Sequence, residues 1–221
     1  MTMSFEKSFG FVFKDPNWVK KLVIGTVFVL LTPFLIGIPF MSGYMIRIIR
    51  QRLQGKEGLP EWDDMGSLFV DGMKTLFIGL VYALPVVVVA FGLAILMFIV
   101  GEVDSDAGAF MGLLFLPFQG LSMLYSLFII LMHPHIYYVI ATDAPLSQAF
   151  HVRKYFQVLK VEWSNVLIAL LMVWLAGALA WFGIFVFIIG FFIALAYVNM
   201  VTGDVYGRLL QDWKSRGLLT A

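Results

Sequence analysis

The chain has 221 residues, of which 61% are hydrophobic and 13% are charged. Soluble globular domains carry about 25% charged residues, so this composition excludes a soluble protein. The absence of cysteine excludes disulfides and thiol chemistry, and a net charge of +1 indicates no nucleic-acid partner. The sequence therefore predicts an all-α, polytopic integral membrane protein in which residues 1–221 form a single membrane domain.

The first segment, residues 1–21, is predicted to lie at the membrane surface. Phe5, Phe9 and Phe13 are spaced four apart, which places them on one face of a short helix. Asp15 is followed by proline, and this pair suits the start of a new helix because aspartate caps a helix and proline fits its first turn.

Residues 22–46 are uncharged, yet they are interrupted at their centre. The predicted helix breaks are Pro33, Gly37 and Pro39. A straight helix would lose backbone hydrogen bonds at these positions, and hydrocarbon offers no water to replace them. Two interpretations follow: one kinked span, or a hairpin that enters and leaves the membrane by the same face.

Residues 47–74 are predicted to form a cytoplasmic charged loop, which holds five of the 15 basic and five of the 14 acidic residues. Asp63 or Asp64 can cap a helix that starts near Met65, and Trp62 suits the membrane interface. The loop either fixes how the first hairpin meets the next span, or docks a partner or ligand. Its candidate interaction residues are Arg47, Arg50, Arg52, Pro60, Glu61, Trp62, Asp63 and Asp64.

Two full spans are predicted next, at residues 75–101 and 107–142. With a rise of about 1.5 Å per residue, each is long enough to cross about 30 Å of hydrocarbon. Glu102, Asp104 and Asp106 form a short acidic turn between them.

The remaining chain is predicted to form two amphipathic helices on either side of a further apolar run. Residues 143–163 and 203–221 place apolar positions on one side and polar positions on another, as in helices at a membrane surface. Residues 164–202 are uncharged and nearly twice as long as a span requires, so they form a long span or a hairpin that doubles back near Gly183. A stripe of small residues can bring helices close together in lipid; it consists of Ala176, Ala180, Gly183, Gly190 and Ala194.

The distribution of basic residues distinguishes two topologies. Four plain spans would split the 15 Lys and Arg residues seven to eight, which leaves no bias for the positive-inside rule. With only the acidic turn facing outward, all 15 lie on one side. We therefore favour two full spans plus two broken or re-entrant hairpins, with both termini cytoplasmic, over the alternative of four plain spans.

The segment around the predicted 47–74 loop contains a pattern of glycine, aromatic and charged residues. The pattern consists of Gly43-Tyr44, Arg47, Arg50, Gly55, Leu59-Pro60-Glu61-Trp62-Asp63-Asp64, Gly66, Phe69, Gly72 and Lys74. On these residues the chain resembles the prokaryotic membrane-protein family known as domain of unknown function 4013, and the hydrophobic layout agrees over nearly the whole chain. The resemblance implies a polytopic protein of a prokaryotic plasma membrane and carries over no catalytic residue.

The sequence contains no recognisable catalytic constellation. His133, His135 and His151 do not form a predicted metal site, because residues two apart do not share a helical face and no carboxylate lies in the same apolar run. The apolar runs contain no Asp, Glu, Lys or Arg, which argues against ion-coupled transport. We expect no enzymatic activity, no cofactor and no metal.

Two functions remain. Hairpins that fill one leaflet, with amphipathic helices on the same face, indicate a structural, scaffolding or membrane-shaping component. Its expected partners are membrane lipid and either further copies of the chain, associated through the small-residue stripe, or a partner membrane protein. The alternative is a passive channel, transporter or lipid-pathway protein, because broken helices expose backbone groups at membrane depth.

Overall fold

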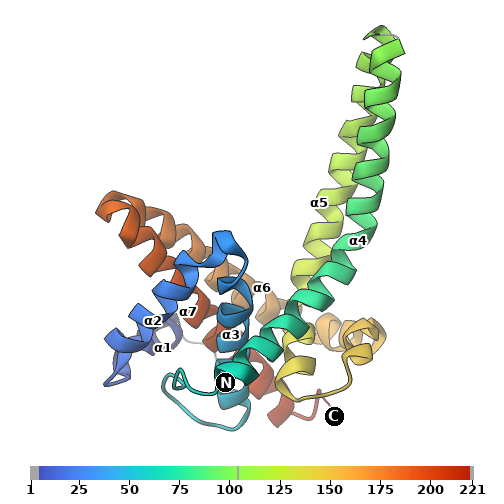
Figure 1. Ribbon diagram of the computed structural model, residues 1–221. Coiled ribbons are helices and arrows are strands. Elements are labelled where there is room, and N and C mark those ends of the chain that lie inside the picture. Colours follow the sequence, from blue (N-terminus) through green and yellow to red (C-terminus); the bar gives the residue numbers. More distant parts are fainter. Residues whose placement is uncertain (1–4, 104, 220–221) are drawn as a thin grey trace. The chain divides into compact units, whose positions relative to one another are not determined.

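A computed structural model describes residues 5–103 and 105–219 of the chain. Every regular element within these residues is a helix (Figure 1), which confirms the all-α prediction. The chain forms two compact units. We call Met1–Leu76 together with Pro134–Ala221 the terminal unit, and Phe77–His133 the central unit.

The helices have the following bounds: α1 Phe5–Gly10, α2 Trp18–Leu30, α3 Gly37–Leu53, α4 Met65–Val103, α5 Ser105–Ala141, α6 Val152–Phe182 and α7 Phe187–Ser215. Four short 3-10 turns lie between them: η1 Val12–Lys14, η2 Thr32–Phe34, η3 Leu146–Phe150 and η4 Gly183–Val186.

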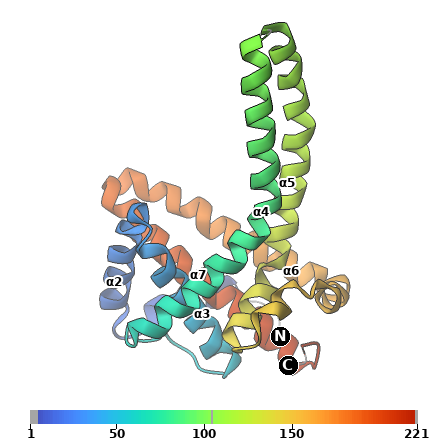
Figure 2. The same cartoon turned by 45° about the vertical axis from the view of Figure 1, so that its right-hand side comes forward.

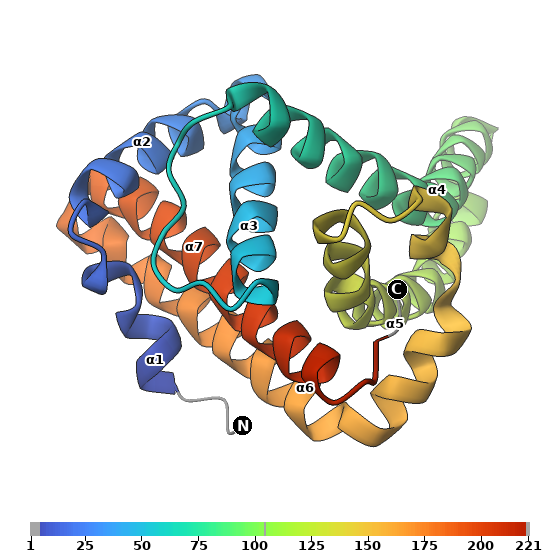
Figure 3. The ribbon, with the colours of Figure 1, turned by 90° about the horizontal axis from the view of Figure 1, so that it is seen from below.

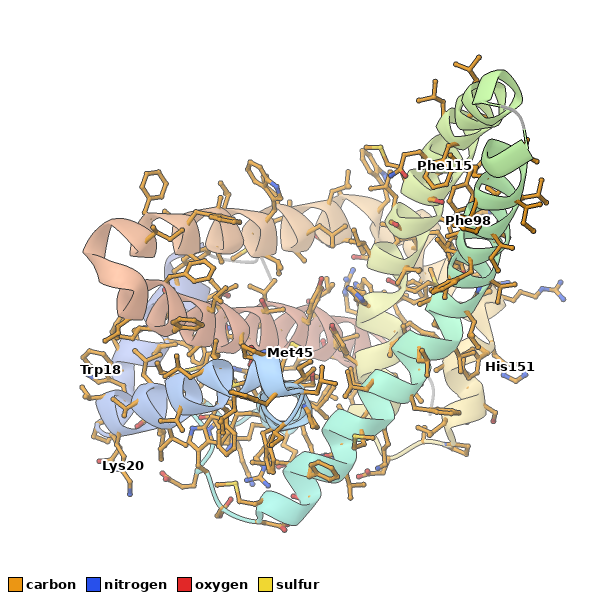
Figure 4. All side chains as sticks on the ribbon, turned by 45° about the horizontal axis from the view of Figure 1, so that its top comes forward. Trp18, Lys20, Met45, Phe98, Phe115 and His151 are labelled. Carbon is orange, nitrogen blue, oxygen red and sulfur yellow. The ribbon has the colours of Figure 1, made fainter. Side chains whose placement is uncertain are left out.

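The central unit is a pair of helices formed by the inner parts of α4 and α5, which run side by side in Figures 1 and 2. The hydroxyl of Tyr125 on α5 donates to the carbonyl oxygen of Tyr82 on α4 at 2.9 Å. Many large apolar side chains face away from the pair, and Phe98 is 70% exposed (Figure 4). An apolar surface of this kind is stable in hydrocarbon, where a helix satisfies its own backbone hydrogen bonds.

Four helices are long and apolar enough to cross a membrane, which supports the predicted membrane protein. The first two overlap the predicted spans at 75–101 and 107–142. The four segments are Met65–Val100, Phe115–Ala141, Tyr155–Phe182 and Ile189–Ser215.

Residues 22–46 fold as two helices that pack side by side, not as one kinked helix. The helix α2 ends at Leu30, and α3 begins at Gly37 after the turn η2. At Gly37 a side chain would collide with the carbonyl oxygen of Phe28 on the neighbouring helix, so the turn requires glycine there.

The two predicted proline breaks lie on either side of that glycine. Pro33 occupies η2, and Pro39 occupies the first turn of α3, where the backbone N–H has no partner within the helix. The predicted breaks therefore end one helix and start the next.

Residues 164–202 also fold as parts of two helices that pack side by side, with a turn that starts at Gly183; whether this pair crosses the membrane stays a prediction. The helix α6 ends at Phe182, and α7 starts at Phe187 and packs against α6. A side chain at Gly183 would collide with the backbone at Gly190, so these two glycines allow the tight turn. Ala176 and Ala180 are buried inside the hairpin, and Ala194 is half-buried.

The predicted separate amphipathic helices at 143–163 and 203–221 are not present as such. Residues 152–163 are the first turns of the continuous helix α6, and residues 203–215 are the last turns of α7. The polar residues that suggested surface helices form contacts within the chain, as described below.

The helix α7 lies at the centre of the terminal unit and packs against α2, α3 and α6 (Figure 3). Gly203 faces Ile48, and Gly207 faces Arg52, four residues further along both helices, so α3 and α7 run parallel. Because α3 follows the turn η2 and α7 follows the turn η4, these two turns lie at the same end of the terminal unit.

The predicted loop at 47–74 is mostly helical. Residues 47–53 belong to α3 and residues 65–74 to α4, which leaves 54–64 as the connection. As predicted, α4 starts at Met65, where the Asp64 carboxylate accepts a hydrogen bond from the backbone N–H of Ser67 at 3.3 Å.

The crossing of α3 and α4 gives a first prediction. A side chain at Gly43 would collide with the backbone of Leu68, which no rotamer change can relieve. Gly43→Ala should destabilise the protein by about 1–3 kcal/mol, seen as a lower melting temperature in detergent. The matched control is Gly79→Ala, whose added methyl group meets open space and should leave the melting temperature unchanged or raise it. Equal effects of the two substitutions would contradict the packing described here.

Candidate functional site

The candidate site is the connection at residues 54–64 together with the residues that hold it. This connection is the part of the predicted 47–74 loop that is not helical, and from here on the name charged loop refers to residues 54–64 alone. Basic side chains from α2 and α3 donate to its backbone carbonyl groups and carboxylates. All of these residues belong to the terminal unit.

Arg47 on α3 holds the end of the charged loop. Its guanidinium donates to the carbonyl oxygens of Asp63 and Asp64, at 2.7 and 3.2 Å, and to the hydroxyl of Ser67 at 2.7 Å. It also pairs with the Asp63 carboxylate at 2.6 Å. Arg47 therefore fixes the position at which α4 begins.

Lys21 holds the middle of the charged loop from α2. Its ammonium group donates to the Leu59 carbonyl oxygen at 2.8 Å and pairs with Asp15 at 2.9 Å and Glu61 at 2.7 Å. Asp15 in turn accepts a hydrogen bond from the backbone N–H of Leu59 at 3.1 Å. Lys21 is only 3% exposed and Asp15 8%, so this pair is a buried contact between the N-terminal segment and the loop.

The pKa values of this pair move in opposite directions. Burial disfavours the charged form of Asp15, but hydrogen bonds from Lys21 and from backbone N–H groups outweigh it and hold the pKa of the carboxyl below its ordinary value. Burial likewise opposes the charged form of Lys21, and its two carboxylate partners outweigh it and raise its pKa.

Two aromatic rings pack under the charged loop. Tyr44 and Trp62 stack with ring centroids 3.9 Å apart and planes within 2°. The Tyr44 hydroxyl donates to the Pro60 carbonyl oxygen at 2.9 Å, and the Trp62 indole N–H donates to the Lys21 carbonyl oxygen at 3.0 Å. Trp62 thus faces the helices and not only the membrane interface, which was its predicted role.

Arg52 connects the charged loop to α7. Its Nε lies 2.5 Å from the Asp204 carboxylate, and both side chains are essentially inaccessible. The other Asp204 oxygen accepts from Arg208 at 2.7 Å, and Arg208 also pairs with Glu57 in the loop at 2.7 Å. Arg52 also donates to the Lys56 carbonyl oxygen at 2.6 Å. We call these four charged residues, Arg52, Glu57, Asp204 and Arg208, the ionic base.

Arg50 makes a separate connection to the end of α5. Its guanidinium pairs with Asp71 on α4 at 2.9 Å and donates to the Ala141 carbonyl oxygen at 3.1 Å. Lys74 also pairs with Asp71, at 3.2 Å. The carboxylate of Asp143 lies within 4 Å of both cations.

Of the predicted interaction residues, Arg47 pairs with Asp63, whereas Arg50 and Arg52 bind carboxylates outside the loop, on α4 and α7. Their basic groups bind carboxylates and carbonyl oxygens of the same chain, which fits the interpretation that the loop fixes how the hairpin meets the next helix. Glu61 and Asp63 keep exposed side chains, so binding of a partner by the loop stays a prediction.

Several residues of the site were not predicted. The sequence predicts a helix cap at Asp15, places Lys21 in the segment at the membrane surface, and places Asp204 and Arg208 in a surface helix. One signal was present in the sequence: Gly203 and Gly207 border Asp204 at a spacing that permits close helix contact. Within the described residues, no three His, Asp or Glu side chains gather as a metal site.

Comparison with protein families matches residues 26–195 to the family described as Protein of unknown function (DUF4013). The match covers most of the chain, so the chain belongs to this family, as the pattern of residues 43–74 predicted. The chain matches no curated protein and no solved structure. The matched range contains the charged loop and both hairpin turns, whereas Lys21 and Asp204 lie outside it.

The ionic base gives a second prediction. Asp204→Asn removes the buried countercharge of Arg52, whose other carboxylate neighbour, Glu57, is exposed and lies 4.0 Å away; this should cost about 3–5 kcal/mol of stability. The matched control is Asp63→Asn, because the Asp63 side chain is 75% exposed and an exposed pair contributes at most about 1 kcal/mol. Tryptophan fluorescence during thermal unfolding in detergent measures both; similar melting temperatures for the two variants would contradict a structural role for the base.

The pKa directions of Asp15 and Lys21 give a third prediction. A lowered carboxyl pKa contributes stability that is present above about pH 4 and lost as the pH falls through the folded pKa. A raised ammonium pKa contributes stability that is present below about pH 10 and lost as the pH rises through the folded pKa. The wild type should therefore melt at a higher temperature than the double variant Asp15→Asn/Lys21→Met. The difference between the two melting temperatures should be greatest between these pH limits and should decrease outside them. A constant difference at all pH values would disagree with this assignment.

Proposed function

We propose that this DUF4013 protein is a non-enzymatic, membrane-shaping protein of the prokaryotic plasma membrane. In this proposal α4 and α5 cross the membrane, and the two hairpins enter it from the cytoplasmic face and turn back inside it. The observation that carries the proposal is the distribution of polar and apolar groups in the terminal unit. Both turns are apolar and lie at one end of the unit, away from the charged groups.

The turns lack groups that would stabilise them in water. Phe34 and Leu35 at the first turn are 71% and 73% exposed, and Phe182 next to the second turn is 65% exposed. Residues 166–198, which include the second turn, contain only apolar residues, glycine and tyrosine. A turn that emerged on the far side of a bilayer would place these side chains in water, so a position within hydrocarbon is favoured.

The charged groups lie away from the turns. Arg52 and Asp204, which join the two hairpins, stand at the last turn of α3 and in the second half of α7. The distance from Gly37 to Arg47 along α3 is about 15 Å at the helical rise, roughly half of a 30 Å hydrocarbon core. The first hairpin is thus too short to cross, and its apolar part matches one leaflet.

This asymmetry is what would bend a membrane. The spanning helices α4 and α5 occupy similar area in both leaflets, whereas the arms of the first hairpin, α2 and α3, add area mainly to the leaflet they enter. An inserted apolar wedge of this type expands one leaflet relative to the other.

The backbone contacts at the first turn favour a wedge over a transport pathway. The N–H groups of Leu35 and Gly37 donate to the carbonyl oxygens of Thr32 and Leu31, at 2.9 and 3.2 Å. The Thr32 hydroxyl donates to the Val29 carbonyl oxygen at 2.7 Å. The break therefore satisfies these polar groups locally instead of presenting them to a solute.

Self-association through the small-residue stripe is not supported. Ala176 and Ala180 pack within the chain, where they bring α6 and α7 together. Trp174 and Trp181 lie on the outer surface of the hairpin, 67% and 66% exposed, and we propose that they contact membrane lipid.

The topology can be tested with single cysteines, because the chain has none of its own. Lys56→Cys and Lys214→Cys should react with an impermeant maleimide only from the cytoplasmic side, and Ser105→Cys only from outside. Ile184→Cys should react from neither side in intact membranes. Labelling of Ile184→Cys from outside would show that α6 and α7 each cross the membrane, and labelling of Lys56→Cys and Lys214→Cys from opposite sides would show four plain spans; either result would contradict the hairpin topology.

Membrane shaping can be tested in liposomes. Wild-type protein should convert large vesicles into smaller vesicles or tubules, as measured by electron microscopy at several protein-to-lipid ratios. Phe34→Ser/Leu35→Ser should reduce this effect several-fold, because it removes apolar surface from an exposed turn without touching the ionic base. The control is Lys214→Gln, which changes an exposed surface position far along α7 from the turn and should leave the vesicle diameters as with the wild type. Unchanged vesicle diameters with correctly inserted wild-type protein would contradict the proposal.

A further inference from the structure

A cavity of about 680 Å³ lies at the start of α6, within the terminal unit. Its walls come from the end of α5, the turn η3, the first turns of α6 and the C-terminal residues Leu218 and Leu219. This volume lies within the usual range of small-molecule sites, about 300–1,000 Å³. None of its lining residues belongs to the charged loop or to the ionic base.

The C-terminal wall of the cavity is held in place. Arg216 forms a double hydrogen bond with the Glu162 carboxylate of α6, at 2.8 and 2.7 Å. The backbone N–H of Leu218 donates to the Trp213 carbonyl oxygen at 3.0 Å. These contacts fold the end of the chain back over α6, so the cavity is a built feature of the fold.

Arg153 is the cationic group of the cavity. The other arginines of the chain, at positions 47, 50, 52, 208 and 216, each pair with a carboxylate. Within the described residues, no carboxylate pairs with Arg153, whose side chain is exposed at the cavity wall. An arginine in this position is available to an anionic group of a ligand.

Further hydrogen-bonding groups lie around the same cavity. His151 precedes the first turn of α6 (Figure 4) and donates from Nδ1 to the Ser147 carbonyl oxygen at 2.8 Å, which holds the ring in place. No side chain caps the first N–H groups of α6. Tyr138 lines the cavity with little of the residue exposed, and its hydroxyl is available for a hydrogen bond to a bound ligand.

The rest of the wall is apolar or aromatic. Val139, Val158 and Leu218 line it, together with Tyr155, which stacks on His135 with centroids 5.1 Å apart. Further along α6, Phe156 and Trp163 are 36% and 60% exposed, and a spacing of seven residues places them on one face of the helix. The cavity therefore combines a cationic part with an apolar part and lies next to an apolar surface of the same helix.

We propose that this cavity binds an anionic amphiphile, a molecule with a phosphate head group and an acyl chain. Arg153, the start of α6 and the Tyr138 hydroxyl bind the head group, and Tyr155, Val158 and Leu218 contact the chain. Inorganic phosphate shares the head-group chemistry, but it leaves the apolar wall without a partner. The apolar surface of α6 gives an amphiphile direct access from the membrane.

The test measures binding of three probes to the full chain in detergent by native mass spectrometry and by thermal shift. Lysophosphatidylglycerol should bind saturably as one molecule per chain and raise the melting temperature. Lysophosphatidylcholine, which has the same chain and a zwitterionic head, should bind at least about tenfold more weakly. Inorganic phosphate at the same concentration should not compete.

Variants separate the site from general surface charge. Arg153→Gln should weaken lysophosphatidylglycerol binding about 10- to 100-fold, because a hydrogen bond to a charged group is lost. Lys160→Gln removes a nearby exposed charge outside the cavity and should change the affinity less than about twofold. Leu218→Trp fills the cavity from its C-terminal wall and should also abolish binding while the melting temperature without ligand is retained.

Three results would overturn the proposal. The first is equal binding of the two lysolipids, the second an equal effect of Arg153→Gln and Lys160→Gln, and the third full competition by inorganic phosphate, which would indicate a plain anion site. The outcome is independent of the membrane-shaping proposal, because neither the probes nor the variants involve the hairpin turns.

Discussion

The buried ion pair between Arg52 and Asp204 sets how the two hairpins meet. A charge removed from water is stable only beside a countercharge with its remaining hydrogen bonds satisfied, and Asp204 meets this condition by accepting from both Arg52 and Arg208. A shift of α7 along α3 by one helical turn, about 5.4 Å, would separate the pair. Gly207 allows the approach, because the position of its missing side chain lies 2.7 Å from Arg52 carbons. The register of the hairpins is therefore fixed by one contact, with a glycine that makes room for it.

Polar and apolar groups are separated along the terminal unit, and the Arg52–Asp204 pair lies at its polar end. The cations of α2 and α3 bind the charged loop, and the turns at the other end contain apolar side chains with locally satisfied backbone groups. In the topology that we propose, this arrangement keeps the polar groups near the head groups and the turns in hydrocarbon. The separation of polar and apolar groups is thus a consequence of where the hydrogen-bonding groups find partners, and it is the basis of the proposed insertion from one side.

Local features of this fold could be predicted from the sequence, and long-range ones could not. The helical class, the breaks at Pro33 and Gly37, the turn at Gly183 and the start of α4 at Met65 all depend on residues close together in the chain. The Arg52–Asp204 pair joins residues 152 positions apart, and no local pattern identifies such partners. The same limit explains why 143–163 and 203–221 were assigned to separate surface helices: residues such as Glu162 and Arg216 looked solvent-exposed but pair with each other. Ala176 and Ala180 of the predicted stripe are buried on α6, which packs against α7.

The helix α7 links the features of the terminal unit. Its first residues follow the second hairpin turn, Asp204 and Arg208 connect its second half to the charged loop, and the residues beyond its end form one wall of the cavity. Trp213 is fully buried between these two regions, so the last turns of α7 are packed as firmly as its centre. A ligand that contacts Leu218 therefore acts on the end of the helix that carries Asp204, through a rigid element and not through a flexible tail. The filling of the cavity by a ligand and the register of the two hairpins therefore both depend on the position of α7.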